Sequence, residues 1–355
     1  MTRLADLLVA RIAATGPITV AEYMAECLLH PVHGYYTTRD PFGAAGDFTT
    51  APEISQMFGE LLGLCLAQAW VDQGGPSRFT LAELGPGRGT LMADVLRATR
   101  AVPGFHAGAD VVLVEASPVL RQMQARRVAR EVRWIGAVGD LPDQPLFLIA
   151  NEFFDALPIR QFQRGADGWR ERLIGLHGDC LAFGLSDPVP VQLVGLPFHA
   201  DPTGTVVEVC PQAASIMQEI SRRLTRHPGA AIVVDYGGWR SKGDTLQALR
   251  QHAPEDPLAH PGAADLTAHV DFEALARHAG APHTGLTDQG TLLTRLGIGQ
   301  RAARLAQALT GKPLESHHAA YHRLTDPAEM GSLFKAIAFH APGSQPPPGF
   351  DPSHA

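Results

Sequence analysis

The chain has 355 residues, of which 45% are hydrophobic and only 18% are charged, and its formal net charge is −7. This length predicts about two domains or one domain with a large insertion, and the low charge predicts a large core with some apolar surface. The negative charge argues against a general nucleic-acid binder, and the apolar runs are shorter than the roughly 20 residues that a membrane span needs.

The cysteines are widely spaced and show neither a C-x-x-C pair nor the spacing of a zinc site. We therefore expect reduced, mostly buried thiols in a reducing compartment. Residues 4–14 predict an amphipathic first helix rather than a signal peptide, although a short mitochondrial presequence remains an alternative. The four cysteines are Cys27, Cys65, Cys180 and Cys210.

Residues 1–75 are expected to be mostly helical. Thr50 and Glu53 have the spacing of a capping box, with Pro52 in the first turn, so they predict the start of the third helix. Between the second and third helices lies a loop with aromatic residues, glycines and one aspartate. The predicted helices cover residues 4–14, 20–29 and 54–71.

From residue 79 the pattern alternates between strand and helix, which is typical of a parallel sheet. The strands are apolar throughout, as strands covered on both faces should be. Ser117 is a natural N-cap, and Pro118 suits the first helical position. The predicted strands are residues 79–84, 110–115, 132–135 and 146–150, and the helices are residues 90–99 and 118–129.

The alternation stops at residues 159–210, where two hairpins and a further strand are expected instead. A buried strand at 231–236 then resumes the sheet, and Asp271 caps a later helix. Further helices are predicted at 213–226, 272–278, 291–309 and 326–338. The predicted organisation is a helical N-terminal cap at 1–75, the first part of the core at 76–158, an inserted substrate subdomain at 159–210, the rest of the core at 211–341, and a flexible Pro-rich tail at 342–355.

The strongest local signal is the run A-E-L-G-P-G-R-G-T at residues 82–90, between a predicted strand and a predicted helix. A nucleotide hydrolase would need a lysine after the last glycine, and a dinucleotide enzyme would show G-x-G-x-x-G. The spacing here is G-x-G-x-G after an acid, which resembles the first motif of class I S-adenosylmethionine-dependent methyltransferases. An acid suits the ammonium of that cofactor, and free backbone amides suit its carboxylate. A plain turn without a ligand is the alternative. The residues concerned are Glu83, Gly85, Gly87 and Gly89.

Two further acids follow the next strands. Glu115 ends the second strand, where an acid in a Rossmann-like unit accepts hydrogen bonds from ribose hydroxyls. Asp140 follows the third strand, where such enzymes often contact the adenine. A solvent-facing strand end and a simple turn residue are the respective alternatives.

The fourth strand ends in Asn151, followed by Glu152, two phenylalanines and Asp155. This end of an open α/β sheet is where the substrate binds, and the mixture of polar and aromatic residues predicts a partly dry pocket. If the chain turns helically, Glu152 and Asp155 share a face and could orient a cationic nucleophile and accept its proton. Alternatively, Asn151 and Asp155 satisfy backbone amides at the turn.

Taken together, these runs resemble the MidA family of S-adenosylmethionine-dependent methyltransferases over nearly the whole chain. The resemblance implies protein arginine methylation. Mitochondrial members of the family are assembly factors for respiratory complex I, and a subunit of complex I is their methylation target. This chain starts almost at the first family motif, so we expect a bacterial cytoplasmic homologue. The matching runs lie at residues 16–18, 23–24, 33–36, 46–50 (GDFTT), 52–60 (PEISQMFGE), 83–92, 114–118, 151–158, 235–237, 244–247, 265–272 (DLTAHVDF) and 330–335 (MGSLFK).

The family segment at 46–56 has no counterpart in a bare methyltransferase core. We expect it to fold over the cofactor as a lid, with Asp47, Thr49 and Gln56 as polar contacts, and a structural helix start is the alternative. His269 is a candidate substrate contact, although a structural loop histidine is the simpler reading.

The sequence thus predicts an α/β protein with a Rossmann-like class I methyltransferase core, a helical N-terminal cap and an inserted β/α subdomain. Glu152 and Asp155 are the expected catalytic residues, because an arginine guanidinium stays protonated and needs carboxylates. S-adenosyl-L-methionine is the expected cofactor and a protein the expected partner, with no nucleic acid, membrane insertion or metal. A second copy of the chain stays open as a partner. The alternatives are a cofactor-binding assembly protein without turnover, a small-molecule methyltransferase and, disfavoured by the glycine spacing, a dinucleotide-dependent oxidoreductase.

Overall fold

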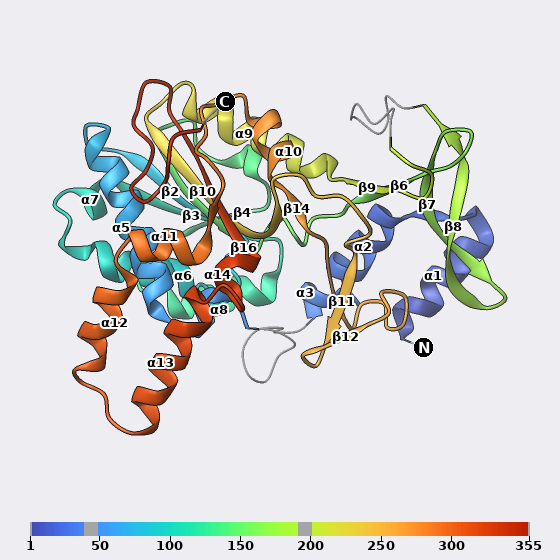
Figure 1. Ribbon diagram of the computed structural model, residues 1–355, viewed down its shortest axis with the longest axis horizontal. Helices are drawn as coiled ribbons and strands as arrows, with labels where there is room; N and C mark the ends of the chain where they lie inside the picture. Colours follow the sequence, from blue (N-terminus) through green and yellow to red (C-terminus); the bar gives the residue numbers. More distant parts are fainter. Residues whose placement is uncertain (1, 39–48, 191–200, 354–355) are drawn as a thin grey trace. The chain divides into compact units, whose positions relative to one another are not determined.

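The computed structural model describes residues 2–38, 49–190 and 201–353 and is drawn in Figure 1. The chain forms two compact units, and each is described by itself. The sheet unit comprises the described residues of 49–154, 215–239 and 271–355. The hairpin unit comprises those of 1–48, 155–214 and 240–270.

The sheet unit is built on a mixed sheet whose strands run in the order β15-β16-β10-β5-β2-β3-β4 (Figure 1). Neighbours from β10 to β4 pair in parallel, whereas β16 is antiparallel to β10, and β15 is antiparallel to β16. The strands are β2 (Phe79–Leu84), β3 (Ala109–Val114), β4 (Arg133–Ile135), β5 (Leu146–Asn151), β10 (Gly229–Gly238), β15 (Thr287–Asp288) and β16 (Phe334–His340).

Every residue of β2 and β5 is buried, as expected for parallel strands that are covered on both faces. The register pairs Leu84 with Val114 and with Ala150, so the carboxyl ends of these strands meet at one edge of the sheet. Loops that leave this edge can therefore combine into one site.

Helices flank the sheet, and two of them, α5 and α6, approach each other closely. A Cβ at Gly59 of α5 would meet the Cβ of Asp94 at 2.7 Å, and one at Gly63 would meet the Val95 Cα at 2.8 Å. The two glycines thus allow the α5–α6 contact. The helices are α4 (Ala51–Ile54), α5 (Gln56–Asp72), α6 (Thr90–Ala98), η1 (Thr99–Ala101), α7 (Phe105–Gly108), α8 (Pro118–Arg127), η2 (Val138–Asp140), α9 (Pro211–Leu224, which starts in the hairpin unit), α10 (Phe272–Ala279), α11 (Gln289–Arg295), α12 (Ile298–Ala306), α13 (Lys312–Thr325) and α14 (Met330–Leu333).

The hairpin unit contains one sheet in the order β1-β7-β6-β9, with β8 paired to β7, and a small sheet in the order β12-β11-β13. Thr19 and Glu22 form a full capping box at the start of α2, which sets the entry of that helix. The elements are α1 (Arg3–Thr15), β1 (Ile18–Thr19), α2 (Val20–Leu29), α3 (Tyr35–Thr38), β6 (Arg160–Arg164), β7 (Trp169–His177), β8 (Cys180–Val189), β9 (Val206–Val209), β11 (Gln247–Arg250), β12 (Ala253–Glu255) and β13 (Asp265–Thr267), and β14 (Val270–Asp271) joins the two units.

Two predicted caps are confirmed. The Ser117 side chain accepts a hydrogen bond from the Leu120 amide, and the Asp271 side chain accepts one from the Ala274 amide. Thr50 is the N-cap residue of α4, as predicted, but the predicted capping box is wrong because the Thr50 side chain makes no capping hydrogen bond. The helix is interrupted at Ser55, whose backbone is extended. The Ser55 side chain accepts a hydrogen bond from the Met57 amide and so caps the start of α5.

The C-terminal helix predictions are partly wrong. The predicted helix at 291–309 is broken at Gly297, which has a φ of +91° between α11 and α12. Of the predicted helix at 326–338, only α14 at residues 330–333 is helical, and residues 334–338 belong to strand β16, whose seven residues pair with β10 in the core of the sheet. Pairing and burial there outweigh local helix propensity. Phe350, further along, is also buried in this unit. None of the described helices is long and apolar enough to cross a bilayer.

Candidate functional site

The glycine loop joins β2 to α6 at the carboxyl edge of the sheet. Gly85, Gly87 and Gly89 have φ values of +57°, +51° and +80°, a conformation that suits glycine. The Gly85 amide donates to the Val114 carbonyl at 3.1 Å, which fixes the loop against β3. A Cβ at Gly85 would meet the Phe153 ring at 2.8 Å, so the loop also lies tightly against the turn after β5.

Glu83 is buried beneath this loop, with 3% of its surface exposed. Its Oε2 atom has no hydrogen-bond partner among the described residues. Burial raises the pKa of Glu83 to about 8, and the nearby Glu115 and Asp94 carboxylates add to the increase, while the Met92 amide opposes it. A buried carboxylate is stabilised by a cationic hydrogen-bond donor, and an ammonium group would be such a donor.

Glu115 lies next to Glu83 in the sheet edge and is also buried. It accepts hydrogen bonds from the Ser117 amide at 2.7 Å and from Gln124 Nε2 at 3.1 Å. Burial raises the pKa of Glu115, and these two donors act in the opposite direction. Gln124 Nε2 also donates to the Gly87 carbonyl at 2.8 Å, so this fully buried amide ties the acid to the glycine loop. Sequence reasoning missed Gln124 because it lies inside a helix without a motif.

Asp140 ends the short helix η2 after β4, and its side chain is exposed. The Asp140 amide donates to the Ala137 carbonyl at 3.1 Å, which closes the turn.

Asn151 and Glu152 mark the end of β5. Asn151 Nδ2 donates to Glu152 Oε1 at 3.0 Å, and the Ala51 amide donates to the same oxygen at 3.2 Å. Asn151 Oδ1 is buried and has no partner among the described residues. Glu152 has a φ of +51°, which is strained for a residue with a side chain and often marks a functional position.

The helical turn that would place Glu152 and Asp155 on one face is not formed, because residues 152–155 are bends and turns and Glu152 is left-handed. Asp155 belongs to the hairpin unit and is buried with 6% exposure. Its carbonyl accepts from the Ala268 amide at 2.9 Å. In the same unit Tyr36 donates to Asp265 at 2.8 Å, and burial together with the negative charges of Asp265 and Asp155 raises the pKa of Tyr36.

Asp235, on β10, supports the turn after β5 and is fully buried. Its Oδ2 accepts from the Phe153 and Phe154 amides at 3.2 and 3.0 Å. We did not assign Asp235 a role from the sequence, although the run at 235–237 belongs to the family resemblance.

The predicted lid is described from Thr49 onward, and Asp47 lies outside the described residues. Thr49 is half-buried, and Gln56 is exposed as the first residue of α5. The strongest contact is made by Glu53 instead, whose carboxylate accepts from the Thr90 hydroxyl and pairs with Arg88 at 3.5 Å. Glu53 thus joins α4 to the glycine loop.

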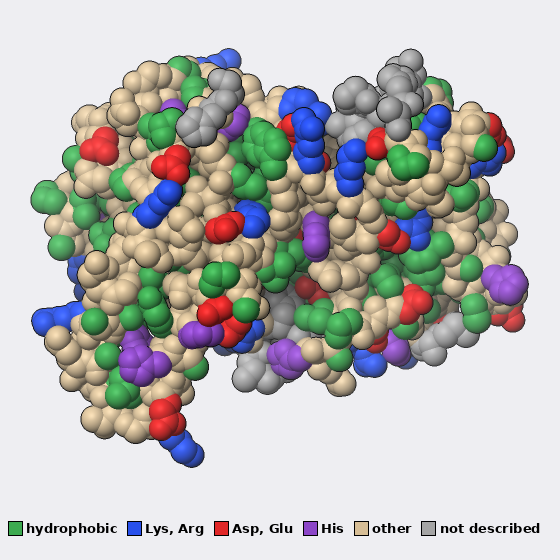
Figure 2. Space-filling model, in the orientation of Figure 1, with side chains coloured by type: hydrophobic (Ala, Val, Ile, Leu, Met, Phe, Trp, Pro, Cys, Tyr) green, Lys and Arg blue, Asp and Glu red, His purple; other side chains and the backbone are tan. Residues whose placement is uncertain are grey.

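The candidate substrate contact His269 lies in the loop before β14. The His269 amide donates to the Thr245 hydroxyl at 2.9 Å, and its side chain is exposed. Histidine side chains gather over α13 (Figure 2), where His317 contacts the Ala302 carbonyl at 2.9 Å. Within the described ranges, no cluster of three or more His, Cys, Asp or Glu side chains could hold a metal ion.

The sheet order, with its antiparallel final pair, and the glycine loop define a class I S-adenosyl-L-methionine-dependent methyltransferase fold. A family model described as an S-adenosyl-L-methionine-dependent methyltransferase matches residues 61–291. The chain belongs to this family, and S-adenosyl-L-methionine is its cofactor. This finding confirms the predicted fold class, enzyme class and cofactor, and rules out the dinucleotide-dependent oxidoreductase.

Similar proteins cover almost all of the chain. Protein arginine methyltransferase NDUFAF7, mitochondrial, from Xenopus laevis is 40% identical over 92% of this chain and 82% of its own length. The Homo sapiens protein of that name is 38% identical over 92% of this chain and 81% of its own length. A crystal structure from Burkholderia thailandensis, described as a methyl transferase bound to S-adenosyl-homocysteine, has a TM-score of 0.84 and 30% identity, and covers 98% of this chain and 93% of its own.

The residues of the sheet unit fit this cofactor. The partnerless buried oxygens of Glu83 and Asn151 are acceptors for donor groups that a ligand would bring. The left-handed glycine loop leaves room for close backbone approach.

Proposed function

We propose that the protein is a protein arginine N-methyltransferase whose acceptor is a protein such as a respiratory complex I subunit. The observation that carries this proposal is the similarity to relatives named protein arginine methyltransferase, at 38–40% identity over 92% of the chain. The half-buried carboxylate of Glu152 and the buried carboxylate of Asp155 support a cationic acceptor.

The sheet unit would hold the cofactor. Glu83 would accept the ammonium, Glu115 the ribose hydroxyls, and Asp140 the adenine, while Asn151 would complete the pocket. The Gly85 and Gly89 amides already donate to the Val114 and Pro86 carbonyls, so the Gly87 amide is the loop glycine amide that would bind the cofactor carboxylate. When bound, S-adenosyl-L-methionine supplies an electrophilic methyl group on a sulfonium. The lid residues Asp47, Thr49 and Gln56 belong to the same proposal, and the loop glycines are Gly85, Gly87 and Gly89.

Glu152 and Asp155 are the proposed catalytic residues. A guanidinium remains protonated at neutral pH, so its nitrogen must lose a proton as it gains a methyl group. A carboxylate can orient the two N–H donors of a guanidinium edge and accept that proton. The strained backbone of Glu152 and its hydrogen bonds from Ala51 and Asn151 support a fixed orientation of its carboxylate.

We also propose a reducing compartment, which in a bacterium is the cytoplasm. All four cysteines are free, and two of them are buried. A secreted protein with four cysteines would more often pair them. A second copy of the chain remains a candidate partner, which sedimentation of the purified protein would test.

The acceptor can be identified by transferring a labelled methyl group into a lysate from a strain that lacks the protein, followed by peptide mapping. Label on arginine supports the proposal. Label on another residue type or in the low-molecular-weight fraction contradicts it, and no label from protein that binds S-adenosyl-homocysteine points to a binding protein without turnover. Glu152→Gln should abolish transfer while changing cofactor affinity by less than about tenfold, or 1.4 kcal/mol. Exposed Glu131→Gln, a matched control, should transfer normally.

A further inference from the structure

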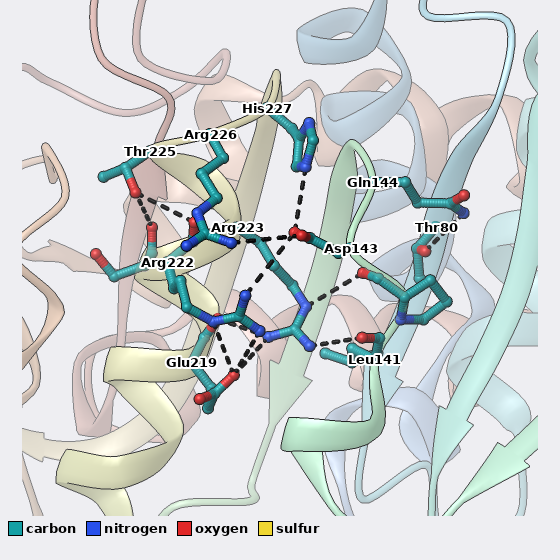
Figure 3. A network of polar contacts seen from close by, with 12 residues as sticks. Thr80, Leu141, Asp143, Gln144, Glu219, Arg222, Arg223, Thr225, Arg226 and His227 are labelled. Carbon is teal, nitrogen blue, oxygen red and sulfur yellow. Dashed lines mark hydrogen bonds and ion pairs between the residues drawn. The ribbon is translucent and has the colours of Figure 1, made fainter.

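Arg223 is an arginine buried inside the sheet unit, on the last turn of α9 (Figure 3). Only 1% of its side chain is exposed. A guanidinium in such a place must have its donors satisfied, because burying a charge without partners is costly.

The partners of Arg223 are mostly backbone carbonyls of one short segment. Its Nη2 donates to the carbonyls of Gly139 at 3.1 Å and Leu141 at 2.5 Å, and its Nε donates to that of Pro142 at 3.2 Å. Its Nη1 donates to the side chain of Glu219 at 2.8 Å, one turn back on α9. The guanidinium therefore binds three carbonyls that lie within four consecutive residues. Figure 3 shows its contacts with Leu141 and Glu219.

These carbonyls flank Asp140, the residue at the end of η2. With the backbone on either side held by a rigid, planar donor group, the exposed Asp140 side chain starts from a fixed position. Leu141, by contrast, is buried and anchors the other face of the turn. No motif links Arg223 to this turn, since the two lie more than 80 residues apart in the sequence.

The neighbouring arginines have a different role. Arg222 is half-buried on α9 and pairs with Glu219 at 3.0 Å and with Asp143 at 3.9 Å. Arg226 is exposed just after the end of α9 and pairs with Asp143 at 3.4 Å. Their hydrogen bonds go to carboxylates, from Arg222 to Glu219 and from Arg226 to Asp143, rather than to the carbonyls that Arg223 binds (Figure 3). Exposed pairs of this kind contribute little to stability and are screened by salt.

We propose that Arg223 is a positioning residue that sets the adenine-recognition turn and thereby the enzyme's selectivity for an adenine base. It acts through Asp140 and has no contact with the reacting atoms. The inference rests on the proposed assignment of Asp140 to adenine, but it holds whether the methyl acceptor is an arginine or another group.

The test compares the affinities for S-adenosyl-homocysteine and S-inosyl-homocysteine, which carries an oxygen in place of the adenine amino group. Calorimetry on the wild type should show a preference of about tenfold or more for the adenosyl ligand, in the range of one charge-assisted hydrogen bond. Arg223→Lys keeps the charge but cannot reach three carbonyls, so the preference should fall below about threefold. The KM for the cofactor should rise while kcat at saturation changes by less than about twofold.

Arg222→Lys is the matched control and should keep the full preference. Glu219→Gln, which loosens Arg223 without removing it, should shift the preference in the same direction and covers the case in which Arg223→Lys does not fold. Hydrogen exchange of the amides at 138–141 in the ligand-free protein should also be faster in Arg223→Lys.

Two outcomes distinguish a failure of the role proposed for Arg223 from a failure of the role proposed for Asp140 in binding adenine. If Asp140→Asn keeps the wild-type preference, Asp140 does not read the adenine, and the inference is overturned together with that assignment. If Asp140→Asn loses the preference while folded Arg223→Lys keeps it, the assignment holds and only the role of Arg223 is refuted.

Discussion

Glu83→Gln is the substitution that most directly tests the cofactor site. The rise in the pKa of Glu83 from its ordinary value of 4.5 to about 8 corresponds to about 5 kcal/mol against the ionised carboxylate in the ligand-free protein. At pH 6.5 the carboxyl is therefore almost fully protonated. If the ammonium of the ligand pairs with it, binding must expel that proton.

The expected release at pH 6.5 is close to one proton for each S-adenosyl-homocysteine bound. Calorimetric titrations in two buffers with different ionisation enthalpies measure this number directly, and Glu83→Gln should reduce it to near zero. At pH 8 the variant should bind about 10- to 100-fold more weakly, the range of a hydrogen bond to a charged group. At pH 5 the difference should shrink, because the wild-type carboxyl must first ionise.

The same group makes the stability of the ligand-free protein depend on pH. A carboxyl whose pKa is raised on folding contributes stability below pH 4.5, and this contribution is lost as the pH rises through about 8. The unfolding midpoint of the wild type should fall across this window relative to that of Glu83→Gln, whose neutral amide does not titrate. Equal proton release and equal affinity in the two proteins would refute the role given to Glu83.

Three further substitutions address the loop, the lid and the core. Gly85→Ala places a Cβ 2.8 Å from the Phe153 ring at a φ of +57°, so we expect a loss of about 1–3 kcal/mol in denaturant unfolding and weaker cofactor binding. Glu53→Gln weakens the link between α4 and the glycine loop, and should raise the cofactor KM several-fold in steady-state assays while leaving the far-ultraviolet spectrum unchanged. Glu60 is buried and receives two hydrogen bonds from Arg301 at 2.7 and 2.9 Å, so Glu60→Gln should cost about 1–3 kcal/mol at pH 7. Burial acts to raise the pKa of Glu60, but hydrogen bonds and charges from its arginine partners lower it overall. The stability that the ionised carboxylate contributes is therefore lost as the pH falls through this lowered pKa, so the cost of Glu60→Gln should diminish in acid.

The sequence was sufficient for the features that local chemistry determines. Four apolar runs gave the strands that meet at the site, and Ser117 and Asp271 were found as caps because a helix start needs a short polar side chain. The glycine loop was recognisable because only glycine adopts its backbone readily, as the φ of +80° at Gly89 shows.

Features that depend on distant partners could not be predicted in this way. Gln124 and Arg223 occur in ordinary helix sequence, and their importance comes from carbonyls that folding brings to them. Strand β16 was mistaken for a helix because its partner β10 lies about 100 residues earlier in the sequence. Helix α13 was missed, since its only buried residue is Leu324 and it therefore lacks a strong apolar stripe.

The wide separation of these partners also has a consequence for synthesis on the ribosome. The residues proposed to touch the cofactor from β2 to the end of β5 have all been made by residue 152, well before the supports that hold their turns. Arg223, which fixes the carbonyls around Asp140, and Asp235, which fixes the amides of Phe153 and Phe154, emerge only later. A nascent chain that ends before residue 223 should therefore contain the contact residues but lack both supports, and it should fail to retain the cofactor. Binding of the ligand by a nascent chain would then show that α9 and β10 have been completed.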